Sequence, residues 1–284
     1  MASRRSLILL LSSFFVLSSC RKGSVSYDWY IRKCHIDDLW ERPKRNDMTV
    51  AVLDSGFDDS YRKYFGDNLL PGYDFVDGDG DVSSSINMHG TYISLLIGAR
   101  RSDEICGIDS RISVLPVRVI GDDGTTTEDR IVDGIEYAIA NGAEVINMSF
   151  GSSKEYPQLK ETIQENHDKA VFVAAAGDLS SSSFLYPAQW DGVLAVRAGD
   201  ADGNPYEYSD SSDRKSVLAP GVNLKGPVIR DSHTYLTRLD GSSYATAIAS
   251  GVVASYLLSS DRKPVEFDSA MFCQDGLLDA SLLS

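Results

Sequence analysis

Short, almost wholly apolar runs recur along the chain from Thr49 onward, and amphipathic segments lie between them. Runs of this kind, rich in β-branched residues, are typical of strands that are covered on both faces. They comprise residues 49–53, 112–117, 144–148, 170–175 and 192–196. The pattern therefore predicts an α/β domain with a mainly parallel central sheet flanked by helices.

Three segments have the apolar spacing of helices. Within 128–141, Ile131, Ile135 and Ala138 recur at helical spacing, and a glycine follows at position 142. Further helices are predicted over 156–168 and from about Ser243 to Leu258. Because no repeat or proline-rich linker interrupts this part of the chain, residues 49–284 are predicted to form one domain. Residues 20–48 form an N-terminal extension that is too short to fold alone.

The first nineteen residues have the order of an export signal. Arg4 and Arg5 precede an apolar run over 7–17, and two serines precede Cys20. This run is shorter than the roughly 20 residues that a membrane-spanning helix needs. Residues 17–20 resemble a bacterial lipobox, which implies removal of 1–19 and a diacylglycerol on Cys20. An ordinary cleaved signal that ends near a cysteine, or a buried helix, is the alternative. The lipobox predicts a protein anchored to the bacterial cell envelope.

Composition narrows the classes of partner. The 284 residues include 27 Lys+Arg and 41 Asp+Glu, a net charge of −14, which argues against nucleic acid and against charge-driven binding to anionic lipid. With 43% apolar and 24% charged residues the composition is that of a globular protein. If Cys20 is lipidated, three of the four cysteines remain, so at least one is unpaired, and a buried inert thiol is expected.

Three short motifs carry the chemistry: Asp54-Ser55-Gly56 after an apolar strand, His89-Gly90-Thr91, and Gly241-Ser242-Ser243. They resemble the Asp, His and Ser motifs of the subtilases, in that family's order. Further stretches resemble family blocks in family order: 134–139, 145–151, 186–188, 219–221 and 276–280. The resemblance implies a three-layer subtilisin-like fold and a monomeric serine endopeptidase that acts on proteins or peptides without a required cofactor.

The residue types fit that chemistry. A serine hydroxyl is a poor nucleophile, so a base must take its proton during attack on a carbonyl. His89 can take the proton of Ser243 and return it to the leaving amine, and Asp54 can hold the imidazole in the required tautomer. Taken singly, each residue has an ordinary alternative: a strand-end cap, a surface histidine and a helix N-cap. Their combination favours a catalytic triad.

One position departs from the family pattern. Subtilases carry an asparagine that donates to the oxyanion, where this chain has Asp178 after 174–177. An ionised carboxylate only accepts hydrogen bonds, and it would repel an oxyanion unless protonated. We therefore expect slow, acid-favoured or narrowly specific catalysis, with Asp178 at the oxyanion site.

The resemblance also places the substrate. Ser149-Phe150-Gly151 and the segment around Gly124 look like the two edges that pair with an extended peptide. Glu128 is open to two interpretations. It either puts negative charge near an outer pocket and favours a basic substrate, or it complements the dipole at the start of its own helix.

A loop rich in carboxylates is a candidate calcium site. Asp77, Asp79 and Asp81 alternate with glycines, as in loops that collect oxygen ligands for a hard cation. The loop is not an EF-hand, because the glycine and glutamate of that motif are missing. Calcium in this stretch is known in parts of the family, although an ordinary Asp/Gly turn has the same composition.

Three functions compete. The sequence favours an exported, lipid-anchored serine endopeptidase. A catalytically silent peptide-binding protein with the same fold is the second, favoured only by Asp178. The third is a maturation protease dedicated to one exported precursor, which the small domain and the altered oxyanion position suit.

Overall fold

The computed structural model describes residues 6–7, 29–42, 48–83, 88–102, 105–230, 233–260, 262–273 and 276–283. Cys20, the predicted site of lipidation, lies outside the described residues, as does most of the predicted signal. Lipidation therefore stays a prediction from the sequence.

A seven-stranded sheet forms the centre of the molecule, and every neighbouring pair of its strands is parallel. In sheet order the strands are β3 (Tyr73–Asp74), β4 (Ser113–Arg118), β2 (Thr49–Asp54), β6 (Val145–Met148), β7 (Val171–Ala175), β8 (Val193–Gly199) and β9 (Val217–Pro220). The apolar runs in the sequence correspond to β2, β4, β6, β7 and β8. The expected α/β class with a parallel sheet is confirmed.

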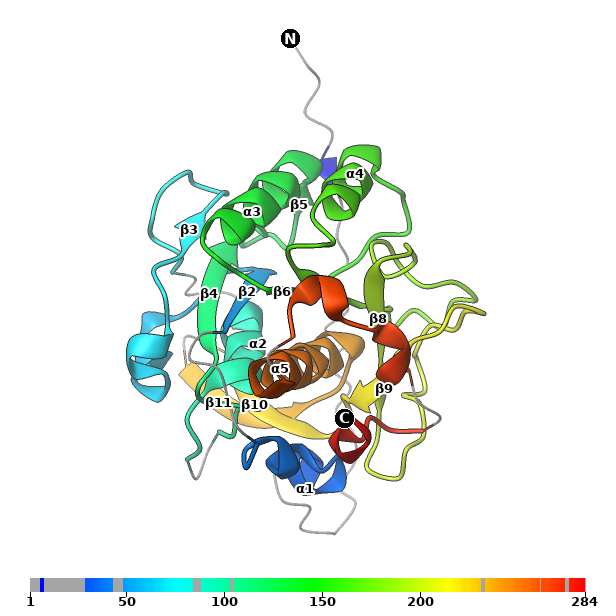
Figure 1. Cartoon of the computed structure of the whole chain (residues 1–284). Coiled ribbons are helices and arrows are strands. Elements are labelled where there is room, and N and C mark those ends of the chain that lie inside the picture. Colours follow the sequence, from blue (N-terminus) through cyan, green and yellow to red (C-terminus); the bar gives the residue numbers. More distant parts are fainter. Residues whose placement is uncertain are drawn as a thin grey trace.

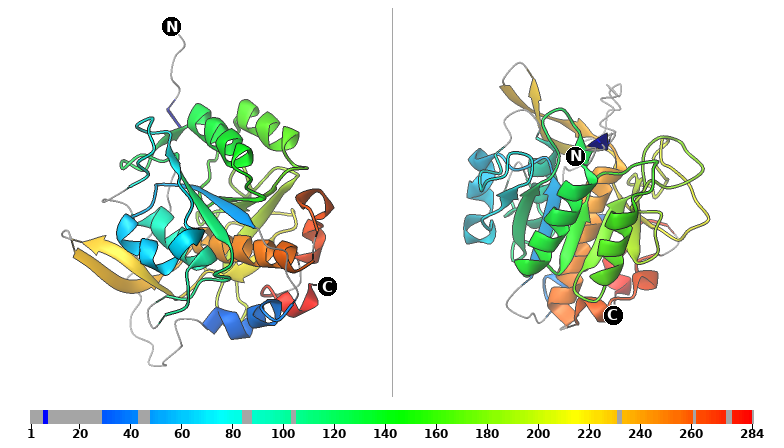
Figure 2. Two further views of the ribbon diagram at one scale, coloured as in Figure 1. Left: turned by 60° about the vertical axis from the view of Figure 1, so that its left-hand side comes forward. Right: turned by 90° about the horizontal axis from the view of Figure 1, so that it is seen from above.

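Helices cover both faces of this sheet (Figures 1 and 2). Helices α2 (His89–Gly98) and α5 (Ser242–Ser260) pack on one face, and α3 (Glu128–Ala140) and α4 (Pro157–Glu165) on the other. Along β2 the side chains alternate between two buried clusters. Val50 and Val52 belong to the core with α2 and α5, whereas Ala51 and Leu53 belong to the core with α3 and α4. A strand buried on both faces needs apolar residues at every position, which explains its unbroken apolar run.

The described part of the N-terminal extension joins the α2–α5 core. Helix α1 (Trp29–Lys33) buries Tyr30 and Ile31, and the 3₁₀ segment η1 (Ile36–Leu39) buries Leu39. The segment also contacts the C-terminal turn η6 (Ala280–Leu282), where the Ala280 amide donates to the Cys34 carbonyl at 2.8 Å. Residues 29–42 are thus built into the same core as the region predicted to be the peptidase domain.

Smaller elements complete the fold. They are β1 (Ser6–Leu7), β5 (Thr126–Thr127), β10 (Leu224–Arg230), β11 (His233–Leu239), η2 (Asp59–Tyr64), η3 (Gly66–Asn68), η4 (Pro264–Glu266) and η5 (Ser269–Met271). Strands β10 and β11 form an antiparallel hairpin, which extends away from the central sheet (Figure 2). Within the described ranges, no helix has the length and apolar character needed to cross a bilayer.

Of the described cysteines, Cys34 and Cys106 are buried and Cys273 is half-buried. Cys34, Cys106 and Cys273 are not joined in disulfides. Burial raises the pKa of the Cys34 thiol to about 12, so the thiolate, which is the reactive form, is scarce at neutral pH. This agrees with the inert thiol expected from the sequence.

Candidate active site

The carboxyl ends of three adjacent strands deliver the polar groups that the sequence analysis singled out. Asp54 ends β2, Ser149 follows β6, and Asp178 lies three residues beyond the end of β7. Two helices begin at the same edge, α2 with His89 and α5 one residue before Ser243. In a parallel sheet this edge is the usual place for a site, because all strands point their carboxyl ends toward it.

Asp54 and His89 form a close buried pair. The His89 Nδ1 lies 2.8 Å from Asp54 Oδ1 and 3.0 Å from Oδ2. Asp54 is fully buried, and His89 is 8% exposed. An ionised carboxylate can only accept hydrogen bonds, so Nδ1 carries the hydrogen. Nε2 is then the ring nitrogen that can exchange a proton with a substrate or nucleophile. The Ser55 amide also donates to Asp54 Oδ1, at 2.7 Å, which fixes the carboxylate in place.

The start of α2 can approach β2 because position 90 is a glycine. A Cβ added at Gly90 would lie 2.4 Å from the Gly56 carbonyl oxygen and 3.1 Å from the Asp54 Cβ. Real side chains do not tolerate such a distance to backbone. The approach is held further by the Asp58 amide, which donates to the Thr91 hydroxyl at 2.8 Å. The histidine motif therefore contains the small residue that the contact with the aspartate motif requires.

Ser243 is partly exposed at the start of α5 and is linked twice to Ser149. Its hydroxyl donates to the Ser149 carbonyl oxygen at 2.9 Å, and the Ser149 hydroxyl donates to the Ser243 carbonyl oxygen at 2.9 Å. A rotation of the serine side chain is needed before its hydroxyl can donate to an imidazole instead. The structure thus brings the segment 149–151, predicted to line the substrate, directly against the predicted nucleophile.

Asp178 lies beside the nucleophile, but its carboxylate is turned toward the neighbouring residue. Its Oδ2 accepts the Ser242 amide hydrogen at 2.8 Å and the Ser242 hydroxyl hydrogen at 2.9 Å. Asp178 is 5% exposed. The carboxylate therefore serves α5 as a cap from another part of the chain, a role in which a negative charge at a helix N-terminus is favourable. The structure places Asp178 next to the predicted nucleophile, and the sequence did not indicate its acceptor role toward Ser242.

Two buried tyrosines pack behind the site, and the sequence analysis did not single them out. The Tyr244 ring lies 5.8 Å from the His89 ring and 5.3 Å from the Tyr92 ring. The Tyr92 hydroxyl donates to the Lys225 carbonyl oxygen of β10 at 2.8 Å. Tyr244 directly follows Ser243, and Tyr92 directly follows Thr91. Their places next to these motifs were the only indication in the sequence that they lie near the site.

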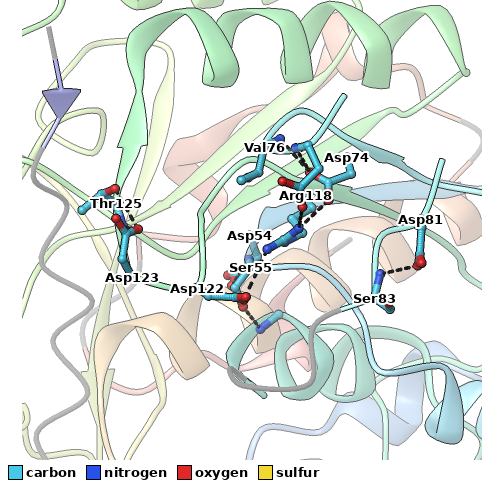
Figure 3. A network of polar contacts seen from close by, with 12 residues as sticks. Asp54, Ser55, Asp74, Val76, Asp81, Ser83, Arg118, Asp122, Asp123 and Thr125 are labelled. Carbon is cyan, nitrogen blue, oxygen red and sulfur yellow. Dashed lines mark hydrogen bonds and ion pairs between the residues drawn. The ribbon is translucent and has the colours of Figure 1, made fainter. Parts of the chain in front are cut away.

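Arg118 organises a loop beside Asp54 (Figure 3). It lies opposite Asp54 in the β2–β4 register, is 5% exposed, and pairs with Asp74, with Asp77 at 2.7 Å and with Asp122 at 3.3 Å. Burial alone would lower the pKa of Arg118, but its hydrogen bonds to Asp74 and Asp77 raise it above the usual value. The guanidinium therefore stays charged and fixes the loop that follows β3.

The candidate calcium loop is engaged in other contacts. Asp77 pairs with Arg118, Asp79 accepts the Asp81 amide at 2.8 Å, and Asp81 accepts the Ser83 amide at 3.0 Å. Over the ranges that the structure covers, no group of three or more His, Cys, Asp or Glu side chains is arranged to hold a metal. The three carboxylates do not converge as a calcium site requires, and Arg118 supplies the positive charge to which Asp77 binds. The present arrangement does not favour calcium in this loop.

The second predicted substrate edge includes the short strand β5, which is paired on one side with β1. Gly124 has a φ of +76°, which glycine adopts without strain, in the turn that leads into β5. Strand β5 pairs in antiparallel register with Ser6–Leu7, and in Figure 1 β1 lies beside β5 above the sheet. An extended segment can therefore hydrogen-bond to this edge.

Glu128 is a structural cap that lies at the starts of two helices. Its Oε1 accepts the amide hydrogens of Gln158 at 2.8 Å and Leu159 at 3.1 Å, at the beginning of α4. Glu128 also lies in the first turn of its own helix α3, as the second interpretation expects, and its contact with α4 is an addition to that role. The contact joins residues 30 positions apart, so local sequence could not reveal it.

Comparison with known proteins agrees with this geometry. Residues 45–264 match the model of the subtilase family. The chain is 31% identical over 249 residues to the thermophilic serine proteinase of Bacillus sp. (strain AK1), covering 86% of this chain and 61% of that protein. It is 31% identical over 220 residues to subtilisin DY of Bacillus licheniformis, covering 75% of this chain and 78% of that protein.

The fold of this chain is also similar to that of a solved structure. The prenylagaramide maturation protease PagA superposes with a TM-score of 0.73 at 26% identity, over 87% of this chain and 96% of that one. The family match extends over the Asp, His and Ser motifs and over all seven strands of the central sheet. The chain therefore belongs to the subtilase family of serine endopeptidases.

Proposed function

We propose that this chain is an exported, lipid-anchored endopeptidase that hydrolyses peptide bonds through Asp54, His89 and Ser243. The observation that carries the proposal is the buried pair of His89 Nδ1 with both oxygens of Asp54, at 2.8 and 3.0 Å, at the strand edge where Ser243 lies in the first turn of α5. That pair fixes the imidazole tautomer with Nε2 as the proton acceptor.

The steps follow from these groups. Ser243 Oγ rotates from the Ser149 carbonyl toward His89, transfers its proton to Nε2 and bonds to the substrate carbonyl carbon. The negative oxygen of the tetrahedral intermediate is stabilised by amide hydrogens at the N-terminus of α5. His89 then gives the proton to the leaving amine, the C–N bond breaks, and an acyl ester on Ser243 remains. Water hydrolyses this ester by the same proton transfers in reverse order.

The way in which an extended peptide can pair with the backbone at this site supports endopeptidase activity. An extended peptide can lie between β5 and the segment 149–151, hydrogen-bonding to both through its backbone. The pairing of β5 with Ser6–Leu7 supports this use of the edge. We infer a role in maturation of one exported precursor rather than bulk digestion, and the similarity to a maturation protease agrees with it.

Export and anchoring rest on the sequence. The lipobox-like stretch 17–20 would place a diacylglycerol on Cys20, and two acyl chains hold a protein on a membrane far more firmly than one. The protein would then act at the outer side of a bacterial membrane. The predicted export route and the predicted peptide substrate are compatible, because both place the enzyme where exported precursors are processed.

A peptide-binding protein without turnover is the second candidate, and the orientation of Asp178 favours it. A carboxylate 2.8 Å from the Ser242 amide puts negative charge next to the place where the oxyanion forms. Such a charge opposes the transition state.

The experiment that separates the candidates compares wild type with Ser243→Ala on a diverse peptide library. We expect cleavage of a narrow set of peptides by wild type and none by the variant, with identical circular dichroism spectra. Casein should be degraded slowly or not at all by either protein. Equal cleavage by the two proteins would refute the triad, and binding without cleavage by wild type would favour the second candidate.

A further inference from the structure

We propose that Asp210 is a positioning residue for catalysis, which holds the loop 177–181 in the shape that keeps Asp178 bound to Ser242 beside the nucleophile. This role rests on the proposed function and adds to it a group that acts through Asp178. Asp210 lies in the connection between β8 and β9, 29 and 31 residues after the two loop amides that it binds.

The loop 177–181, which follows β7, has a backbone shape that needs support from another segment. Gly177 has a φ of +117° and Ser180 a φ of +54°. Glycine adopts this region freely, whereas a serine is rarely found there. Residues with such a backbone persist where the surrounding structure fixes them, and they cluster at functional sites. Contacts from outside the loop are therefore needed to keep its shape.

Asp210 binds the loop on both sides of its left-handed serine. Its Oδ1 accepts the amide hydrogen of Leu179 at 3.0 Å and that of Ser181 at 2.6 Å. Its own amide donates to the Gly177 carbonyl oxygen at 3.0 Å. Ser180 is thus placed between two neighbours that one carboxylate oxygen holds.

The residues next to Asp210 bind the same loop through their backbone. The Ser180 amide donates to the Tyr208 carbonyl oxygen at 2.9 Å, and the Ser211 amide donates to the Ser181 carbonyl oxygen at 2.9 Å. These bonds do not involve the Asp210 side chain. A substitution at position 210 therefore removes the two bonds to Oδ1 and leaves the segments joined.

The Asp210 side chain is buried against the residue that precedes Asp178. It is 0% exposed, and a Cβ added at Gly177 would lie 2.2 Å from Asp210 Oδ2. Within the described ranges, Oδ2 has no hydrogen-bond partner. Burial of a carboxylate oxygen without a partner is unfavourable. The contribution of the carboxyl group is thus the pair of bonds made by Oδ1, which no apolar side chain could accept.

The loop is connected to the nucleophile through Asp178. Asp178 Oδ2 accepts the amide and hydroxyl hydrogens of Ser242, and Ser243 is the next residue in the first turn of α5. A shift of the loop would move this carboxylate away from the helix start, whose amides stabilise the oxyanion in the proposed mechanism. Misplacement of groups at a site by about 1 Å costs up to about 100-fold in rate.

The test is a double-mutant cycle on kcat, with the purified full chain and one cleavable peptide. Asp210→Ala should lower kcat by about 10–100-fold and change KM by less than about threefold, because the substrate-pairing edges keep their bonds. In an Asp178→Ala background the same substitution should lower kcat by less than about threefold, since the side chain that Asp210 positions is gone. Asp210→Asn keeps an acceptor oxygen and should restore most of the rate that Asp210→Ala loses.

Asp200 provides a matched control. It lies in the same connection between β8 and β9, and its Oδ1 also accepts two amide hydrogens, from Asp202 and Asn204, both at 2.9 Å. These two partners belong to its own turn and not to the loop 177–181. Asp200→Ala should therefore leave kcat within about twofold of wild type.

Two results would overturn the role of Asp210 while the endopeptidase function stood. One is an unchanged kcat in folded Asp210→Ala, and the other is an equal loss of kcat with and without the Asp178 side chain. If Asp210→Ala does not fold, hydrogen exchange of wild type decides. The amides of Leu179 and Ser181 should exchange at least about tenfold more slowly than unprotected amides, and unprotected exchange would overturn the role.

A failure of the proposed function would be recognised separately. Wild type that neither cleaves any peptide nor is labelled at Ser243 by a phosphonate would overturn the endopeptidase function, and the positioning role of Asp210 in catalysis with it. Labelling of Ser243 together with an Asp210→Ala defect that depends on Asp178 would support both.

Discussion

Replacing Asp178 by asparagine should make the enzyme faster and less stable at the same time. Asp178 Oδ2 accepts two hydrogens of Ser242, at 2.8 and 2.9 Å. Hydrogen bonds to a charged group contribute about 1.5–3 kcal/mol each and neutral ones about 0.5–1.5 kcal/mol. In Asp178→Asn the amide oxygen keeps both bonds as a neutral acceptor, so the free energy of unfolding should fall by about 1–3 kcal/mol. Part of that loss is the favourable interaction of the charge with the helix dipole.

The rate should change in the opposite direction. With the asparagine oxygen in the place of Oδ2, the amide nitrogen replaces Oδ1, so a hydrogen-bond donor replaces a negative charge beside Ser243. Removal of one oxyanion donor costs about 10²–10³ in kcat in a subtilisin, and that magnitude is the upper limit of what the substitution can restore here. Asp178→Ala is the control, because it removes the charge and both hydrogen bonds but adds no donor. It should be the least stable of the three proteins and slower than Asp178→Asn.

The assay is kcat at neutral pH on one cleavable peptide, with urea unfolding of the same preparations. A rate that stays equal or falls in Asp178→Asn, together with unchanged stability, would show that Asp178 neither caps α5 nor borders the oxyanion. A lower stability with an unchanged rate would retain the cap and refute the effect on the oxyanion.

Two further predictions concern parts of the chain outside the triad. Burial raises the pKa of the Asp210 carboxyl, and hydrogen bonds from the backbone amides of Ser181 and Leu179 oppose this shift. Asp210 therefore stabilises the fold fully below about pH 3.9, and this contribution is lost as the pH rises through the pKa of the folded state. The melting temperature of Asp210→Asn relative to wild type should therefore increase between pH 3.5 and pH 7, and a constant difference would contradict this. Cys20→Ser should move the protein from the membrane fraction to the soluble fraction after cell lysis, and a variant that still sediments with membranes would refute lipid anchoring.

The sheet could be predicted because its strands are buried on both faces. Such strands must be apolar at nearly every position, so the run at 49–53 identifies β2 without knowledge of its neighbours. The contact between Asp54 and His89 could be predicted for a different reason. Asp54 ends an apolar strand, and Gly90 after His89 lets the two motifs approach closely, so each motif is longer than one residue.

Contacts between distant segments could not be predicted. Glu128 caps a helix that begins 29 residues later, and nothing near Glu128 in the sequence distinguishes that role from a charge in a pocket. Asp210 lies in a polar stretch whose composition indicates only a loop. Its hydrogen bonds to the loop 177–181 exist only once two separate segments have met. The acceptor role of Asp178 likewise depends on Ser242, which is 64 residues away.

The most direct test of the central claim is covalent labelling of Ser243. A fluorophosphonate reacts with a serine when a neighbouring base removes the hydroxyl proton: the serine oxygen bonds to phosphorus, fluoride leaves, and a stable phosphonate ester remains whose mass identifies the residue. The arrangement of Asp54 and His89 predicts a single adduct, on the tryptic peptide that contains Ser243, in wild type. The adduct should be absent in Ser243→Ala and formed far more slowly in His89→Ala. Folded wild type that gains no adduct, or an adduct whose rate does not depend on His89, would contradict the account.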